Sequence, residues 1–151
     1  MAYKVNLSLH DNVKKALRYS LDEWRQEQYR KANYTCYVTK KYKSKDKRLQ
    51  LDVHHMNISF EEAIQLSHQR LGIKRHEFKY QYKEGEFDKI TAEVIRIHYE
   101  EIEAVVLEHN VHMNLHKYYG QNFTKEQLKE FKHSYRTRLY KSKNGNQKRS
   151  A

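Results

Sequence analysis

Proline is absent from this 151-residue sequence, which also contains only one cysteine, one tryptophan and four glycines. The single thiol, Cys36, excludes an internal disulfide and a cysteine-rich zinc site, which fits a reducing compartment. The longest apolar run is the four residues from Ala104 to Leu107, so we expect neither a transmembrane span nor a secretory signal. With 38% hydrophobic residues, the chain is long enough for one domain with a modest core.

Positive charge is abundant, and it gathers toward the two ends of the chain. The sequence has 30 Lys and Arg against 19 Asp and Glu, which gives a net charge of +11. Residues 1–50 carry 13 basic and 5 acidic side chains, residues 51–131 carry 10 and 14, and residues 132–151 carry 7 and none. Two basic segments folded together would attract a phosphate polymer through counterion release. We therefore expect a nucleic-acid partner, with a merely solvated surface as the alternative.

Apolar periodicity predicts a largely helical chain of the α+β fold class. The predicted helices are 12–19, 21–31, 60–71, 88–103 and 124–140, and a short helical stretch with His112 and His116 ends at Gly120. Capping boxes indicate three of the starts, at Ser20, Ser59 and Thr124, and Gly72 indicates one end. We expect a single domain over residues 1–140, with helices at its N-terminal side, followed by a basic flexible tail over 141–151.

Two short segments have the composition of β-strands. Residues 35–39 are rich in β-formers, and apolar residues alternate with polar ones over 49–53, so a hairpin is predicted there. Its tip would be the basic loop 40–48. We expect phosphate contacts from this loop and from the last helix and tail, a solvated face being the alternative. The residues concerned are Lys40, Lys41, Lys43, Lys45, Lys47, Arg48, Arg136, Arg138, Lys141 and Lys143.

Four of the ten histidines form two local pairs. His54 and His55 are adjacent at the end of a predicted strand and would point to opposite faces, one toward a metal and one toward a substrate. His112 and His116 are four residues apart on a predicted helix, so both rings leave the same face and suit one cation. Three histidine ligands leave coordination positions open, and a fourth histidine can act as a general base near pH 7. Alternatively, the pairs are an ordinary strand end and an exposed helix face.

The order of these motifs resembles the phage-associated type of HNH endonuclease. The first half of the resemblance is Cys36-Tyr-Val-Thr39, the basic loop, Leu51-Asp-Val-His-His-Met56 and Ser59-Phe60. The second half is Leu107, His112-Met-Asn-Leu-His116-Lys-Tyr-Tyr-Gly120, Asn122-Phe-Thr124 and Gln127 through Phe131. Together the matching segments cover roughly residues 20–135.

The resemblance implies a ββα-metal (His-Me) finger embedded in additional α-helices, with Ala104–Leu107 as its second strand. It implies that His55 is the general base and that His54, His112 and His116 hold one divalent metal ion, Mg, Mn, Zn or Ni. The implied activity is metal-dependent hydrolysis of DNA phosphodiester bonds. The implied setting is cytoplasmic, in a phage- or prophage-encoded protein.

The sequence departs from the family pattern at the middle asparagine, which is missing from residues 99–108. In the family this asparagine braces the backbone of the finger, and Asn57 and Asn110 are nearby without being clearly equivalent. The departure leaves a non-catalytic DNA-binding protein with a degenerate HNH fold as one alternative. An RNA-cleaving nuclease is another. His98 is expected to be a core histidine rather than a site residue.

Overall fold

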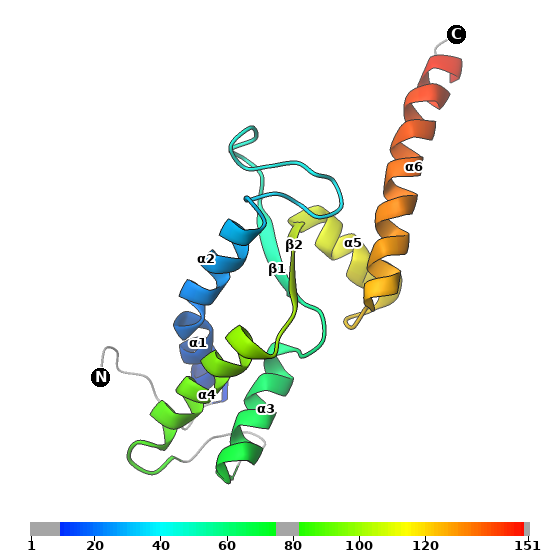
Figure 1. The fold of residues 1–151 in the computed structure, drawn as a ribbon. Helices are drawn as coiled ribbons and strands as arrows, with labels where there is room; N and C mark the ends of the chain where they lie inside the picture. The colour runs from blue at the N-terminus through cyan, green and yellow to red at the C-terminus, as the bar shows by residue number, and fades with distance from the viewer. Residues whose placement is uncertain (1–9, 75–81, 150–151) are drawn as a thin grey trace. The chain divides into compact units, whose positions relative to one another are not determined.

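The computed structural model describes residues 10–74 and 82–149, of which 10–11 and 138–149 are described by their backbone alone. Within these ranges the chain is mixed α+β, with six helices and one two-stranded antiparallel sheet (Figure 1). The elements are α1 (His10–Ser20), α2 (Asp22–Lys31), β1 (Leu51–His55), α3 (Phe60–Leu71), α4 (Glu86–Glu100), β2 (Ala104–Glu108), α5 (His109–Tyr119) and α6 (Lys125–Arg149). None of the helices in the described ranges has the length and apolar character needed to cross a bilayer.

The chain divides into two compact units that interleave along the sequence. Unit 1 comprises Met1–Glu27 and Asn57–Glu103, and unit 2 comprises Gln28–Met56 and Ala104–Ala151. Each unit has its own cluster of buried apolar residues. The expectation of one domain over residues 1–140 stays a prediction.

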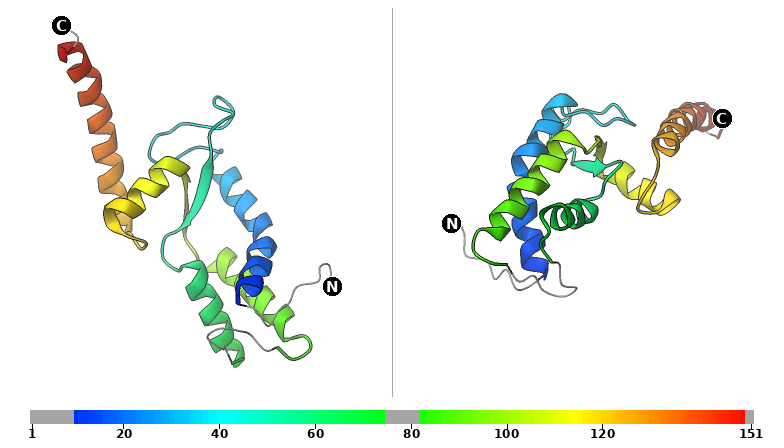
Figure 2. Two further views of the ribbon diagram at one scale, coloured as in Figure 1. Left: turned by 180° about the vertical axis from the view of Figure 1, so that it is seen from behind. Right: turned by 60° about the horizontal axis from the view of Figure 1, so that its bottom comes forward.

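Unit 1 is helical, and α3 and α4 pack side by side in it (Figure 2). Its core consists of Val13, Leu17, Leu21, Ile64, Ile90 and Val94. The predicted boundaries of α3 are confirmed: the Ser59 hydroxyl accepts the Glu62 amide at 3.0 Å, and Gly72 ends the helix with φ at 65°. His98 is confirmed as a core residue, because it is 1% exposed and packs edge-on against Trp24 at 4.8 Å.

The capping box predicted at Ser20 is wrong. The Ser20 hydroxyl donates to the Leu17 carbonyl at 2.6 Å, one turn back, so it supports the end of α1. The next helix, α2, begins at Asp22, where two acidic residues lie in its first turn and favour its N-terminus.

One asparagine side chain joins the two ends of the long segment of unit 1. Asn57 donates through Nδ2 to the Glu101 carbonyl at 2.8 Å and accepts the Glu103 amide through Oδ1, also at 2.8 Å. A side-chain amide can satisfy a donor and an acceptor of the backbone at once. Asn57 therefore acts as a clasp between chain segments that are more than forty residues apart in sequence.

The sheet of unit 2 pairs segments that are far apart in the sequence. β1 runs antiparallel to β2, with Leu51 opposite Glu108 and His55 opposite Ala104. The strand expected at Ala104–Leu107 from the family resemblance is confirmed. The predicted hairpin between 35–39 and 49–53 is wrong, because β1 takes β2 as its partner. The alternation at 49–53 indicates a half-buried strand, but it carries no information about the strand's partner.

Residues 35–42 form a compact loop in place of the predicted first strand. Thr35 makes an isolated bridge with Tyr42, and Lys40 donates its amide to the Cys36 carbonyl at 2.9 Å. The loop also reaches the sheet, since the Tyr37 amide donates to the Val106 carbonyl at 2.9 Å. The β-forming residues of this segment thus contact a strand without adding a regular one to the sheet.

α5 follows β2 directly, and α6 completes the apolar cluster of unit 2. The buried members of this cluster are Cys36, Val38, Leu107, Val111, Leu115, Phe123, Leu128 and Phe131. The capping box at the start of α6 is confirmed in both directions: Thr124 accepts the Gln127 amide at 3.1 Å and donates its own amide to the Gln127 side chain at 2.8 Å.

α6 extends beyond the predicted end near Tyr140. Its backbone is helical to Arg149, whereas we expected a flexible tail from Lys141. The segment contains no proline, most of its residues are tolerated in helices, and a single glycine costs only about 1 kcal/mol. The helix propensity of this segment therefore has more effect on its backbone than its polar composition, from which we predicted a flexible tail.

Candidate metal centre

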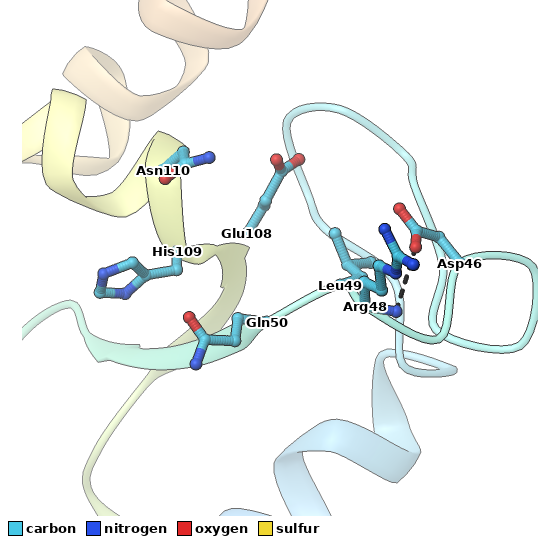
Figure 3. A pocket seen from close by; sticks show the side chains of 7 residues that line it. All are labelled: Asp46, Arg48, Leu49, Gln50, Glu108, His109 and Asn110. Atoms are coloured by element: carbon cyan, nitrogen blue, oxygen red, sulfur yellow. Dashed lines mark hydrogen bonds between the residues drawn. The ribbon is translucent and has the colours of Figure 1, made fainter.

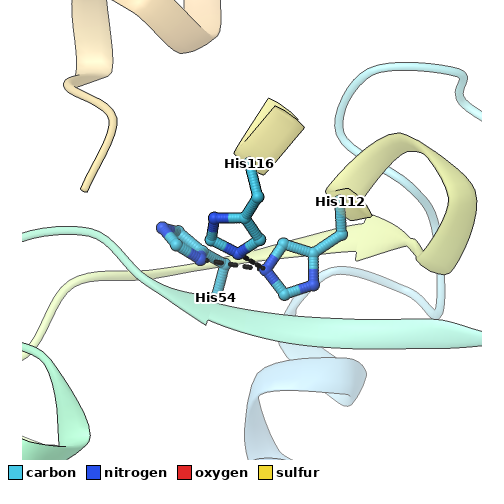
Figure 4. Close-up of side chains that lie close together, drawn as sticks. All are labelled: His54, His112 and His116. Atoms are coloured by element: carbon cyan, nitrogen blue, oxygen red, sulfur yellow. Dashed lines mark hydrogen bonds between the residues drawn. The ribbon is translucent and has the colours of Figure 1, made fainter. Parts of the chain in front are cut away.

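Three histidines from two elements of unit 2 converge, as the sequence predicts. His54 comes from β1, while His112 and His116 lie one turn apart on α5 (Figure 4). His112 Nε2 lies 3.0 Å from His54 Nδ1 and 2.8 Å from His116 Nε2. One nitrogen of each ring lies within 4.8 Å of the other two, close enough for all three to hold a single ion.

The His54 ring is fixed by burial against an aromatic side chain. His54 is 8% exposed, and its ring stacks on that of Phe123 with 4.1 Å between centroids and 13° between planes. Phe123 is itself 2% exposed and belongs to the core of unit 2. This packing restricts rotation of the His54 ring and keeps its Nδ1 directed at the two rings on α5.

Hydrogen bonds fix the orientation of the other two rings. His112 Nδ1 lies 3.0 Å from Asp52 Oδ2, and His116 Nδ1 lies 3.1 Å from the Gly120 carbonyl oxygen. A carbonyl or carboxylate oxygen can only accept, so each Nδ1 carries the proton and donates it. The Nε2 of each neutral ring therefore presents a lone pair toward the centre of the cluster, the tautomer that a metal ligand needs.

These tautomers leave two lone pairs facing each other across 2.8 Å, between His112 Nε2 and His116 Nε2. Two lone pairs at that distance repel unless a proton or a cation lies between them. A divalent ion bound by both nitrogens and by His54 Nδ1 removes the repulsion. The donor set therefore fits a metal ion that accepts nitrogen ligands, such as zinc or nickel, better than one that prefers oxygen alone.

The protonation state of the cluster also suits metal binding. Burial, followed by the charges of His112 and His116, lowers the pKa of His54 to about 3. Burial lowers the pKa of His112 as well, although its hydrogen bond with Asp52 acts in the opposite direction. Imidazole must be neutral to bind a metal, so few protons have to be displaced from these two rings at pH 7.

His55, the expected general base, is the next residue of β1. Consecutive strand residues point to opposite faces, so His55 leaves the strand on the other side from His54. It is half-buried and lies opposite Ala104 in the sheet. Its charge contributes to the lowering of the pKa of His54. Its role as a base stays a prediction.

The basic loop predicted to contact phosphates is exposed throughout. Lys40, Lys41, Lys43, Lys45, Lys47 and Arg48 are all exposed, and so is Arg136 on α6. Within this loop Lys43 Nζ donates to the Leu49 carbonyl at 2.6 Å, and Lys41 Nζ lies 3.8 Å from a Glu108 oxygen. Arg138, Lys141 and Lys143 are not among the residues whose side chains the structure describes.

A polar pocket of about 240 Å³ lies beside the start of β1 and of α5 (Figure 3). Its lining residues are Asp46, Arg48, Leu49, Gln50, Glu108, His109 and Asn110. His109 connects the pocket to the metal centre, because its Nδ1 lies 2.7 Å from the same Asp52 oxygen that His112 contacts. Asp52 is thus shared by a residue of the pocket and a residue of the histidine cluster.

Sequence reasoning did not identify Asp52, His109 or Phe123. For two of them the signal was available in the spacing. Asp52 precedes His54 by two residues and so shares its face of the strand, while His109 precedes His112 by three and so shares its face of the helix. Phe123 follows the helix end at Gly120, and only the tertiary fold brings its ring against His54.

Comparisons of this chain with protein-family models, with curated proteins and with solved structures found no match.

Proposed function

We propose that this protein is a metal-dependent endonuclease of the HNH type that hydrolyses DNA phosphodiester bonds. The observation that carries the proposal is the convergence of His54, His112 and His116 with the lone pairs of the two α5 rings directed inward. The order of β1, β2 and α5, with one ligand on the first strand and two on the helix, matches the ββα-metal finger that the sequence resembles.

Asn57 supports the same proposal. The family's middle asparagine braces the finger backbone, and the sequence lacks it at the usual position. The Asn57 clasp makes two backbone hydrogen bonds just beyond the ends of β1 and β2. A brace of the same physical kind therefore exists in this chain, which weakens the case for a degenerate, non-catalytic fold.

Each residue of the centre has a role that follows from its position. His54, His112 and His116 would hold the ion, which when bound offsets negative charge developing on the scissile phosphate. His55 would take the proton of the attacking water at a ring nitrogen. Asp52 keeps His112 in the ligand tautomer, and Phe123 excludes water from one side of His54.

Cleavage of supercoiled plasmid DNA and of a single-stranded RNA tests this function. Each polymer is incubated with the parent protein and Mg²⁺, Mn²⁺, Zn²⁺ or Ni²⁺, with EDTA as the blank. We expect metal-dependent nicking of DNA, and a loss of at least about 100-fold in rate in His55→Ala with metal binding retained. His133→Ala, which removes an exposed histidine on α6, is the matched control and should cleave at the parent rate.

Each contrary outcome points to one alternative. A parent protein that binds DNA but cuts neither polymer with any of these metals supports a non-catalytic binding protein. Cleavage of RNA alone supports the RNA-cleaving alternative. If His55→Ala nicks DNA at the parent rate, the assignment of the base is wrong.

A further inference from the structure

The ring of Tyr37 has two ammonium groups close to it, and they come from different elements. Lys132 Nζ of α6 lies 4.0 Å from the ring centroid, and Lys40 Nζ of the loop lies 5.2 Å from it. Tyr37 is partly buried against the core of unit 2 and is anchored by its amide to the Val106 carbonyl at 2.9 Å. A fixed ring therefore holds the ends of two lysines near one point of the surface.

A third cation adds to this pair. Arg136 lies four residues after Lys132 on α6, so the two share one helix face. Burial and the neighbouring charges of Lys40 and Arg136 lower the pKa of Lys132. The three side chains are thus close enough for their positive charges to act on one another. We call Lys40, Lys132 and Arg136, with the Tyr37 ring, the α6 cation cluster.

Within the part of the chain that the structure describes, no carboxylate pairs with Lys40, Lys132 or Arg136. Glu108 of β2 contacts this part of the chain, but through residues outside the cluster. It accepts the Thr39 hydroxyl at 3.2 Å and lies 3.8 Å from Lys41 Nζ. Like charges held together without a counter-ion are destabilising, and a bound anion would relieve that repulsion.

We propose that the α6 cation cluster is a phosphate-binding subsite that holds the DNA backbone at a position distinct from the metal centre. The inference rests on the proposed function for its ligand. Two ammonium groups and a guanidinium are the donors that proteins use for phosphate, and the guanidinium can bind two phosphate oxygens at once. In the described part of the chain no hydrogen bond, ion pair or ring contact joins these three residues to the histidine cluster, so the subsite positions the polymer and takes no part in bond cleavage.

The test measures binding of a fluorescein-labelled 20-base-pair DNA duplex by anisotropy, in EDTA so that no cleavage occurs, over a series of NaCl concentrations. In Lys40→Gln/Lys132→Gln we expect binding weakened about tenfold at low salt and a slope of log Kd against log[salt] that is lower by about 1 to 2. Lys89→Gln is the matched control, because Lys89 is also an exposed lysine but lies on α4, in the unit that does not contain the cluster. It should keep the parent slope.

Folding is checked by circular dichroism and by Co²⁺ titration of the metal centre. Should the double variant fail to fold, Arg136→Gln carries the same test, since this side chain is exposed and a slope lower by about 1 is expected. The subsite is overturned if the cluster variants bind with the parent affinity and slope, or if the parent does not bind the duplex. Failure of the proposed function is a separate result, seen as a parent protein that binds DNA normally and does not cleave it.

Discussion

His112 and His116 direct the lone pairs of their Nε2 atoms at each other across 2.8 Å, because the opposite nitrogen of each ring donates its proton to an oxygen. The arrangement is unfavourable in isolation and favourable around a cation. Both hydrogen-bond acceptors are supplied by the chain itself, so both rings are held in the tautomer that a metal ligand needs.

The first prediction is that the protein binds one divalent ion per chain and that His112→Ala abolishes this binding. The loss should exceed 100-fold in affinity, since the variant removes the ring that contacts both other ligands. Titration calorimetry with Zn²⁺ and the visible spectrum of bound Co²⁺ provide the measurement. At a free concentration of 100 times Kd, the ion should also raise the free energy of unfolding by about 2.7 kcal/mol.

His133→Ala is the control for this prediction, because it removes an exposed histidine that does not belong to the cluster. Equal Zn²⁺ affinity in His112→Ala and His133→Ala would contradict the assignment of the ligands.

The second prediction concerns Asp52. Asp52→Asn replaces an acceptor-only oxygen with an amide that can present an N–H to His112 Nδ1, so the ligand tautomer loses its support. We expect Zn²⁺ affinity to fall about 10–100-fold without loss of the fold. His109→Ala should have a smaller effect, because Asp52 then keeps its contact with His112. An affinity in Asp52→Asn equal to that of the parent means that the carboxylate does not orient the ring.

The third prediction is that the protein loses stability as the pH falls from 7 to 5. Burial lowers the pKa of His98 below the ordinary histidine value of 6.5, and burial also lowers the pKa of His54, to about 3. Above pH 6.5 these rings are neutral in both the folded and the unfolded chain. Below it the unfolded chain takes up protons that the folded chain does not, so the free energy of unfolding decreases.

Urea unfolding of the metal-free protein at pH 7.0 and pH 5.0 measures this dependence. His98→Leu removes one of the rings responsible, so its stability should change less between the two pH values. His133→Leu, at an exposed position, should leave the dependence as in the parent. An unchanged pH dependence in His98→Leu would show that this ring is protonated equally in the folded and unfolded chains.

The fourth prediction is that Asn57→Ala destabilises the protein by about 1–2 kcal/mol. The variant removes two hydrogen bonds to the backbone of residues 101 and 103, and such bonds contribute about 1 kcal/mol each. Asn122→Ala, at another exposed asparagine, should change stability by less than about 0.5 kcal/mol. Thermal and urea unfolding give the comparison, and equal midpoints for the two variants would show that the clasp does not contribute.

The ligand set could be predicted from the sequence because its geometry is mostly local. The spacing of His112 and His116 fixes two rings on one helix face, and strand alternation separates His54 from His55. The meeting of the two pairs depends on β1 pairing with β2, which no local pattern specifies. The family resemblance supplied the second strand, whereas β-propensity pointed to a hairpin partner at 35–39 that the structure does not form.

The contacts that support the site were less predictable because they depend on tertiary packing. Phe123 stacks on His54, which lies 69 positions earlier in the sequence. Lys40, in a loop, lies close to Lys132 on the last helix. Neither pairing follows from periodicity or propensity. Helix ends were predicted well where a side chain caps the backbone, as at Ser59 and Thr124.

Because the two units interleave along the sequence, the residues of the histidine cluster are synthesised at different times during translation. Every residue of unit 1 precedes Ala104 in the chain, so unit 1 can emerge and fold while β1 still lacks a strand to pair with. His54 would leave the ribosome 58 residues ahead of His112, with no ring to meet. A nascent chain would therefore carry a folded helical unit and no metal centre. The three-histidine cluster would form only after α5 has been synthesised.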